Sequence, residues 1–305
     1  STSNIRGNAY MIATVSGACN TLTTVCSNYK LATFKGPGTF CVSCAAQCAA
    51  ENLVSYVVVA GGGAGGYGGY PYSSTHLAGA GGAGGYRELV SPASPYTGSP
   101  TEGYPTPGNR ITVSATGYPI VVGGGGSLPP GATSPGGDGS DSTAFGLTST
   151  GGGGGGGGDA GGNTGGSGGG GGSGPCTPQG GGAGNTPPIT PAQGFAGGSG
   201  DHSPGGARAG GGGGATTVGQ NGTGGPYPVS CSPKFGVGGT GAPTQITGSP
   251  AYYAGGGGGS SNCCSVPIDS RKGGDGGGGA GATNGDEIAV AGTVNTGGGG
   301  GAGSS

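Results

Sequence analysis

The chain has 305 residues, of which 91 are glycine and 23 are proline, far more than an ordinary globular domain contains. Only 7% of the residues are charged and the formal net charge is −2, whereas disordered chains combine low hydrophobicity with high net charge. The nine lysines and arginines are scattered along the chain, and no apolar run reaches the roughly 18 residues of a membrane-spanning helix. We therefore expect an ordered protein that binds no nucleic acid and does not insert into a membrane.

Residues 1–60 are expected to form an N-terminal β-strand region. Short runs rich in β-branched and aromatic residues alternate with Gly, Asn and Pro, a pattern typical of strands joined by turns. Only the segment 44–54 has a composition suited to a turn or two of helix, so the chain is predicted to be mainly β with almost no α-helix. The expected strands are 9–15, 21–26, 29–34, 38–44 and 53–60.

Residues 61–305 are expected to form a glycine-rich domain that shares one core with residues 29–60. Strand-like inserts interrupt it at 110–122, 143–150, 215–219, 244–254 and 286–294. The glycine tracts lie at 61–66, 78–85, 123–126, 151–158, 161–174, 180–184, 205–214, 255–259, 273–281 and 297–303.

Three structures could accommodate these tracts. Collagen requires glycine at every third position, but 151–158 is a run of eight glycines. Glycine-rich segments commonly form flexible linkers, but ten linkers in one ordered chain are not expected. The third structure is the polyglycine-II helix, with three residues per turn and every N–H and C=O directed at neighbouring chains. We predict a bundle of polyglycine-II helices with 151–158 in its interior. Residues that interrupt the tracts are expected on outward faces of surface helices: Ala83, Ser167, Asp275 and Ala280.

The nine cysteines leave several interpretations open. Cys41, Cys44 and Cys48 have a spacing compatible with zinc, with a fourth ligand from Cys19 or Cys26. Cys41 and Cys44 overlap an expected strand, where positions i and i+3 face opposite sides, so disulfides are favoured over zinc and free thiols are the other alternative. The adjacent Cys263 and Cys264 are not expected to pair with each other. All nine are candidate disulfide cysteines: Cys19, Cys26, Cys41, Cys44, Cys48, Cys176, Cys231, Cys263 and Cys264.

No catalytic constellation stands out in the sequence. Gly-x-Gly-x-x-Gly matches many windows by chance, and none is followed by the acidic residue and helix pattern of a dinucleotide fold. Asp201, His202 and Ser203 are adjacent, but a triad needs such residues to converge in space. We therefore predict that the chain is not an enzyme and has no catalytic, cofactor-binding or metal-binding residue.

Recognition is expected in the inserts between the glycine tracts, because the tracts present little but backbone. The richest inserts are 67–77, 91–108, 226–235 and 260–272, and loops on a rigid scaffold commonly carry binding residues. Tyrosine supplies rigid contact area there, while the alternative is that these rings cap the ends of the glycine tracts. The candidate recognition residues are Tyr67, Tyr70, Tyr72, Tyr96, Tyr104, Tyr227, Arg271 and Lys272.

An ordered series of motifs resembles a known family. In chain order it reads YKLATFKGPGTFCV, VSYVVVAGGGAGG, GAGGAGGYRE, ITVSATGYPIVVGGGG, STGGGGGGGG, TGSPAYYAGGGGG and TVNTGGGGGAG. Over about residues 29–303, the series resembles the glycine-rich domain of tail-fibre and other virion structural proteins of marine bacteriophages. More distantly, it is similar to the glycine-rich domain of the anaplastic-lymphoma-type receptor kinases.

The resemblance implies a jelly-roll-like β-sandwich that carries a bundle of polyglycine-II helices. It also implies a non-enzymatic structural protein at the virion surface or outside the cell, as a tail-fibre or fibre-tip component with host-receptor adhesion. The implied partners are further copies of the chain, with a trimer favoured, other virion proteins and a host-surface receptor. The alternative is an extracellular cell-surface or filament-forming structural protein of a bacterium or alga. An ice-binding bundle is disfavoured, because such a protein needs a flat, repetitive face and these tracts are unequal in length.

Overall fold

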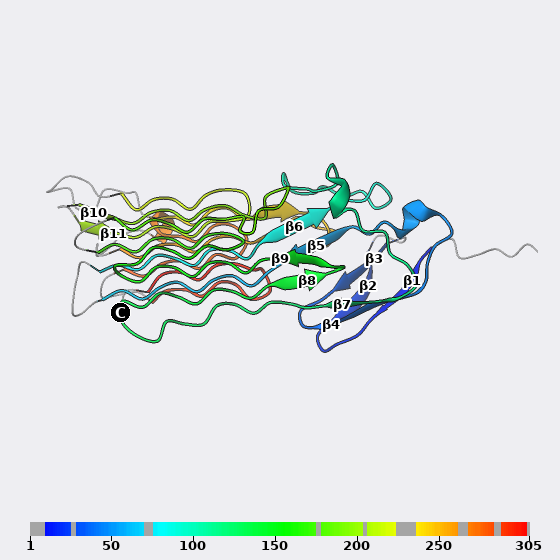
Figure 1. The fold of residues 1–305 in the computed structure, drawn as a ribbon, viewed down its shortest axis with the longest axis horizontal. Coiled ribbons are helices and arrows are strands. Elements are labelled where there is room, and N and C mark those ends of the chain that lie inside the picture. The colour runs from blue at the N-terminus through cyan, green and yellow to red at the C-terminus, as the bar shows by residue number, and fades with distance from the viewer. Residues whose placement is uncertain are drawn as a thin grey trace, which may run out of the picture.

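The computed structural model describes residues 10–25, 29–69, 76–174, 178–203, 206–223, 236–261, 268–283 and 288–303. Figure 1 shows an elongated molecule with two ends of different character. Most of the strands gather at one end, and extended segments run side by side along the long axis towards the other. The described helices are three short 3-10 turns, so the prediction of a mainly β chain with almost no α-helix is confirmed.

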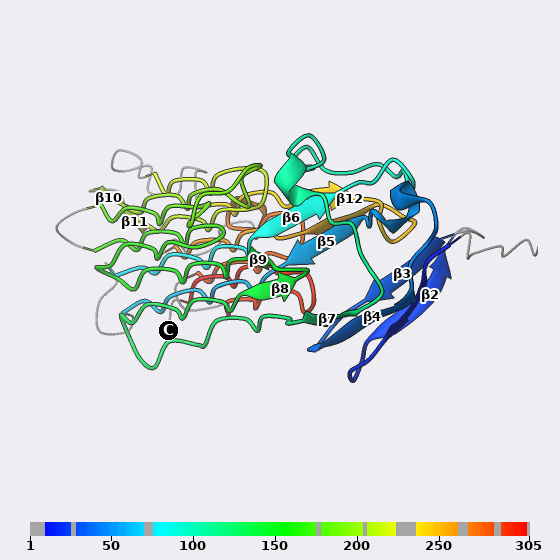
Figure 2. The same ribbon diagram turned by 45° about the vertical axis from the view of Figure 1, so that its right-hand side comes forward.

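The strand-rich end, which we call the β end, contains small antiparallel sheets. One has the order β1 (Ile12–Val15), β4 (Gly38–Cys44), β7 (Gly117–Ile120), and beside it β2 (Thr21–Val25) pairs with β3 (Tyr29–Thr33). Figure 2 separates these strands from a second layer. That layer contains β5 (Tyr56–Val59) paired with β6 (Tyr86–Leu89) and β8 (Ser142–Ala144) paired with β9 (Leu147–Ser149).

Alternation of side chains along these strands forms the core. Phe40 and Val42 on β4 are buried while Cys41 between them is exposed, as the two-residue period of a strand requires. The Phe40 ring packs edge-on against Phe145, with ring centroids 5.9 Å apart. The buried members of the core come from both layers: Phe40, Val42, Tyr56, Val58, Leu89, Val113, Ile120 and Ala144.

The remaining elements show where the expected strands were right. Each of the first five expected runs contains a strand, and so do the inserts at 110–122 and 143–150. The insert at 244–254 contains β13 (Ala251–Tyr253), which pairs with β12 (Ala242–Thr244). In contrast, 215–219 and the described part of 286–294 form no strand. Four of the described strands were not expected, since β12 overlaps an expected insert only at Thr244: β6, β10 (Asp201–Ser203), β11 (Gly206–Arg208) and β12. The 3-10 turns are η1 (Ala49–Asn52), η2 (Pro107–Asn109) and η3 (Ile268–Ser270).

The extended segments form what we call the glycine bundle, made of the described residues within 60–85, 123–141, 150–200, 209–241 and 254–303. Its backbone hydrogen bonds repeat every three residues. In tract 60–67 the bonds alternate between two neighbouring tracts, with N···O distances of 2.9–3.0 Å. The N–H groups of Ala60, Gly63 and Gly66 donate to Gly85, Gly82 and Gly79, and those of Gly61, Ala64 and Tyr67 donate to Ser140, Gly137 and Ser134.

Close packing of backbone explains why these positions are glycine. All eight residues of 151–158 are buried, as the sequence predicts for an interior tract. A β-carbon on Gly154 would lie 2.0 Å from the carbonyl oxygen of Gly136, a distance that no side chain can adopt. A tract in this environment has room for a hydrogen on Cα and for nothing larger.

The expectation that interruptions face outward is wrong for three of the four residues. Ala83 and Ser167 are fully buried and Ala280 is 9% exposed, whereas Asp275 is exposed as expected. The reason is that small side chains share gaps between tracts, since the methyl groups of Ala78, Ala80 and Ala302 form a buried cluster of their own. The bundle interior therefore accepts a side chain of one or two heavy atoms where neighbouring tracts leave space for it. The residues concerned are Ala83, Ser167 and Ala280.

Candidate functional site

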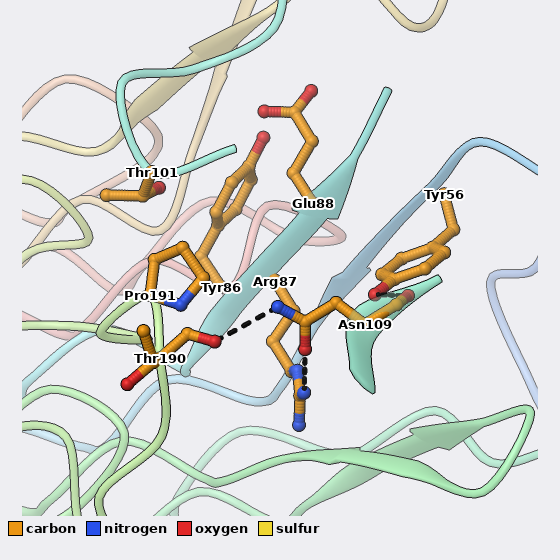
Figure 3. A pocket seen from close by; sticks show the side chains of 8 residues that line it. All are labelled: Tyr56, Tyr86, Arg87, Glu88, Thr101, Asn109, Thr190 and Pro191. Atoms are coloured by element: carbon orange, nitrogen blue, oxygen red, sulfur yellow. Dashed lines mark hydrogen bonds between the residues drawn. The ribbon is translucent and has the colours of Figure 1, made fainter. Parts of the chain in front are cut away.

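A small cavity lies where β6 meets the loop that precedes η2. Its volume is about 10 Å³, which is the space of one water molecule. In Figure 3, Tyr86 and Glu88 project from one side of β6 and Arg87 projects from the other. The full lining is Tyr56, Tyr86, Arg87, Glu88, Thr101, Asn109, Thr190 and Pro191.

Asn109 ties three distant segments together beside this cavity. Its Nδ2 donates to the carbonyl oxygen of Thr190 at 3.0 Å, and its Oδ1 accepts from Arg87 Nη2 at 3.0 Å (Figure 3). The Tyr56 hydroxyl donates to the Asn109 carbonyl oxygen at 2.8 Å. The buried amide therefore joins β5, β6 and the loop around Thr190, which is a structural role.

The carboxylate of Glu88 is buried, with 2% of the residue exposed. It accepts hydrogen bonds from the Ser99 amide at 2.6 Å and from Thr244 Oγ1 at 2.5 Å. Burial and, after it, the negative charge of Glu88 raise the pKa of Tyr86 and of Tyr96 well above the usual range. The phenols therefore stay protonated at neutral pH, and the carboxylate of Glu88 is held by the hydrogen bonds from Ser99 and Thr244.

Burial also raises the pKa of Tyr56 to about 12. Sequence reasoning did not single out Tyr56, Glu88 or Asn109. A lone carboxylate after a glycine tract has no distinguishing spacing, and Thr244 lies 156 residues away from Glu88 in the chain. No sequence signal could have brought them together.

The recognition candidates of the loop 91–108 are held against the β end. The Tyr96 hydroxyl donates to the Leu89 carbonyl oxygen at 3.4 Å, and the ring is half-buried. The guanidinium of Arg110 stacks 4.3 Å from the centroid of the Tyr104 ring, and Glu102 accepts from the Tyr104 amide at 2.6 Å. Both tyrosines anchor their own loop.

The other described candidates lie elsewhere. Tyr67 is half-buried at the opposite end of tract 60–67, where its N–H donates to Ser134. Arg271 is 2% exposed and donates to the carbonyl oxygen of Gly281. Its side chain therefore does not face solvent, as a recognition residue must. Lys272 beside it is exposed. The structure thus does not gather these candidates into one site. Three candidates lie outside the described residues: Tyr70, Tyr72 and Tyr227.

The four described cysteines are free thiols: Cys19, Cys41, Cys44 and Cys48. Within the described ranges, no group of three histidine, cysteine or acidic residues could hold a metal ion, so the zinc alternative gains no support. Strand β4 carries Cys41 on its exposed side and Cys44 on the half-buried side, as the alternation of a strand predicts. The five other candidate disulfide cysteines lie outside the described residues: Cys26, Cys176, Cys231, Cys263 and Cys264.

Two histidines lie at the end of the bundle away from the β core. His202 is on β10, between Asp201 and Ser203, in a hairpin with β11 (Figure 1). His76 Nε2 contacts Asp159 Oδ2 at 2.9 Å, and the Asp159 side chain is 59% exposed. This contact, which is an ion pair when the imidazole is protonated, links two segments of the bundle.

Among the segments that the structure describes, no helix has the length and hydropathy needed to cross a membrane. None of the curated proteins or solved structures compared with the chain matches it. The family model of a glycine-rich domain matches residues 35–305, which include β4 and all of the glycine tracts. The chain therefore belongs to the glycine-rich domain family.

Proposed function

We propose that the chain is a non-enzymatic structural protein of a virion surface, a component of a tail fibre or fibre tip that takes part in adhesion to the host. The observation that carries the proposal is the backbone-bonded bundle, fixed to a side-chain core at one end. A bundle of this kind has few side chains for a protease to bind, and it holds the loops between its tracts at fixed positions.

The finer fold proposal is a jelly-roll-like β-sandwich with a bundle of polyglycine-II helices. The two layers of strands that contribute to one core support the sandwich. The three-residue repeat of hydrogen bonds in tract 60–67 supports polyglycine II, because a helix with three residues per turn returns to the same neighbour every third residue. The buried run 151–158 supports it too, since an interior helix needs glycine on all three of its faces.

The proposed location is the virion surface, and the resemblance of the ordered motifs to bacteriophage virion proteins supports it. The proposed partners are further copies of the chain, other virion proteins and a host-surface receptor. Among the described recognition candidates, the exposed Lys272 is available for such a contact.

Immunogold electron microscopy of the source culture, with antibodies raised against the purified chain, tests this location. We expect label at the tails of particles, and we expect Fab fragments of the same antibodies to block adsorption of the particles to cells. Label on cell envelopes or on filaments without particles would overturn the virion proposal and favour the cell-surface alternative.

A further inference from the structure

Among the residues that the structure describes, one face of tract 60–67 has no hydrogen-bonded neighbour. A chain with three residues per turn presents three rows of N–H groups and three rows of C=O groups, so it can bind six neighbouring segments. Five of these rows are bonded in tract 60–67. Two N–H rows donate to carbonyl oxygens of 79–85 and of 134–140. The three C=O rows accept from N–H groups of 152–155, of 300–303 and of Gly126. The sixth row consists of the N–H groups of Gly62 and Gly65, which bind no acceptor within the described chain. The row is closed only beyond the tract, where Gly68 donates to the carbonyl oxygen of Gly303.

The neighbouring tract 297–303 has a complementary vacancy. The carbonyl oxygens of residues 297 and 300 accept from the N–H groups of residues 84 and 81. The carbonyl oxygens of residues 299 and 302 accept from the N–H groups of residues 279 and 282. The third row, the carbonyl oxygens of Gly298 and Gly301, accepts no hydrogen bond from any described residue.

These two rows meet in one place. Gly62, Gly65, Gly298 and Gly301 all line an open groove of about 880 Å³, bordered by 125–129 on one side and 288–292 on the other. We call this groove the slot. It presents backbone donors from one tract and acceptors from the next, each at a spacing of three residues.

Considering the described residues alone, the slot is unsatisfied in two respects. Gly62, Gly65 and Gly301 are buried, and a buried N–H or C=O without a partner is unfavourable. Apolar side chains also stand exposed at its borders, with Leu128 85% exposed and Ile288 91% exposed. Both features are relieved if another chain lies in the slot.

We propose that the slot binds an extended glycine segment of a second copy of this chain. An occupant must offer carbonyl oxygens to Gly62 and Gly65 and N–H groups to Gly298 and Gly301, which is what a chain with the same three-residue period does. It needs glycine where it faces these tracts, as every interior tract does. The chain itself supplies such segments, with exposed glycines at Gly161 and Gly180.

This inference rests on the self-association and the polyglycine-II bundle of the proposed function and names the surface that would carry them. Because the slot and the donated segment are different surfaces, the contact is heterologous. Such a contact closes into a ring or continues as a filament.

Amide hydrogen exchange on the purified chain tests the proposal directly. At low protein concentration, the amides of Gly62 and Gly65 should exchange fast while those of Gly63 and Ala64 are protected. At high concentration all four should be protected, with Gly62 and Gly65 slowed about tenfold or more, as expected for amides that gain a bond. Exchange at Gly62 and Gly65 that does not depend on concentration would overturn the proposal.

Substitutions in the slot provide the second test, by analytical ultracentrifugation. Gly125→Val adds a side chain to the slot wall, with its β-carbon 3.7 Å from the nearest atom of the chain, so the fold should survive. Its control is Gly124→Val in the same tract, which does not line the slot and whose β-carbon meets nothing within 4 Å. Ile288→Lys puts a charge at the border, and Val218→Lys is its control at a 56% exposed position outside the slot.

We expect Gly125→Val and Ile288→Lys to weaken self-association about tenfold or more, which is 1.4 kcal/mol, and the two controls to leave it unchanged. A chain that stays monomeric, or controls that weaken association as much as the slot variants, would contradict the proposal. These measurements use the purified chain and do not depend on where the protein resides. A negative result would therefore contradict the slot proposal and leave the proposed virion location to its own test.

Discussion

The β end and the glycine bundle are stabilised by different parts of the same chain. In the β end, side chains such as Leu89, 0% exposed, and Val42, 2% exposed, fill the space between two layers of strands. In the bundle, 151–158 has no side chains. The N–H groups of 152, 153, 155 and 156 donate to backbone carbonyl oxygens of other tracts. Those of Gly151 and Gly154 donate to the carboxylates of Asp141 and Asp138. The comparison teaches that the stability of the β end depends on how well its side chains pack. The stability of the glycine bundle depends on the absence of side chains, which lets backbone pack against backbone.

The energies of the bundle explain why it is attached to a β core. A backbone hydrogen bond contributes about 1 kcal/mol net, while ordering a glycine costs about 0.5–1 kcal/mol more than ordering an alanine. These terms nearly cancel, so the bundle gains little stability by itself. Three tracts connect directly to core strands: 60–67 follows β5, 78–85 precedes β6 and 151–158 follows β9. The core thus fixes where the tracts start.

The largest effect is expected from a side chain placed inside the bundle. In Gly154→Val, the new β-carbon meets Gly136 backbone at 2.0 Å, and backbone cannot move aside as a flexible side chain can. We expect a loss of more than about 3 kcal/mol, beyond ordinary overpacking, seen as loss of soluble folded protein or a lower denaturation midpoint. Asp275→Asn, at an exposed position, is the control and should change stability by less than about 0.5 kcal/mol. Equal tolerance at the two positions would refute the backbone-lattice explanation.

Truncation of the side-chain core should have the next largest effect. Leu89→Ala removes a fully buried side chain and should cost about 2–5 kcal/mol in urea denaturation, because the cavity it leaves is only partly refilled. Val294→Ala, at a position that is 80% exposed and outside the slot, should cost less than about 0.5 kcal/mol. If Leu89→Ala were as mild as Val294→Ala, the β end would not be the anchor of the molecule.

Much of this fold could be predicted from the sequence, because its signals are local. Runs of β-branched and aromatic residues gave the N-terminal strands, and a run of eight glycines indicated a buried tract. Strand β6 could not be predicted in this way, since Arg87 and Glu88 are unusual in a strand and only pairing with β5 explains them.

The parts that depend on contacts between distant residues were not predictable. Whether Ala83 and Ser167 face solvent depends on which tracts surround them, and their own neighbours in sequence do not reveal it. The same applies to the buried Glu88, whose partner Thr244 lies on strand β12, and to the slot between 60–67 and 297–303.

Alkaline pH should weaken the β end through its buried tyrosines. The folded pKa of Tyr86 lies above the ordinary value of 10, so the folded state keeps a proton that the unfolded state loses. The stability from this group is complete below about pH 10 and falls above it, by about 1.4 kcal/mol per pH unit. The contribution of Tyr56 should fall over pH 10 to 12, because its folded pKa is about 12.

Urea denaturation between pH 8 and 11 checks this expectation. Tyr86→Phe should reduce the slope of stability against pH above pH 10, whereas Tyr252→Phe, at a residue 47% exposed, should not. An unchanged slope in Tyr86→Phe would mean that this phenol ionises in the folded protein as it does in the unfolded chain.

The smallest effect is expected from the ion pair at the far end of the bundle. His76 and Asp159 are 2.9 Å apart, but the Asp159 side chain is 59% exposed, and exposed pairs contribute at most about 1 kcal/mol. Asp159→Asn should therefore lower stability by less than about 1 kcal/mol at low salt, and the difference should shrink as salt screens the charges. The backbone bonds around the pair are the reason, since Gly69 still donates to the His76 carbonyl oxygen at 2.9 Å whatever the side chains do. Urea denaturation at two ionic strengths measures both quantities. A salt-independent loss above about 2 kcal/mol would show that side chains, rather than the backbone lattice, hold this end of the bundle together.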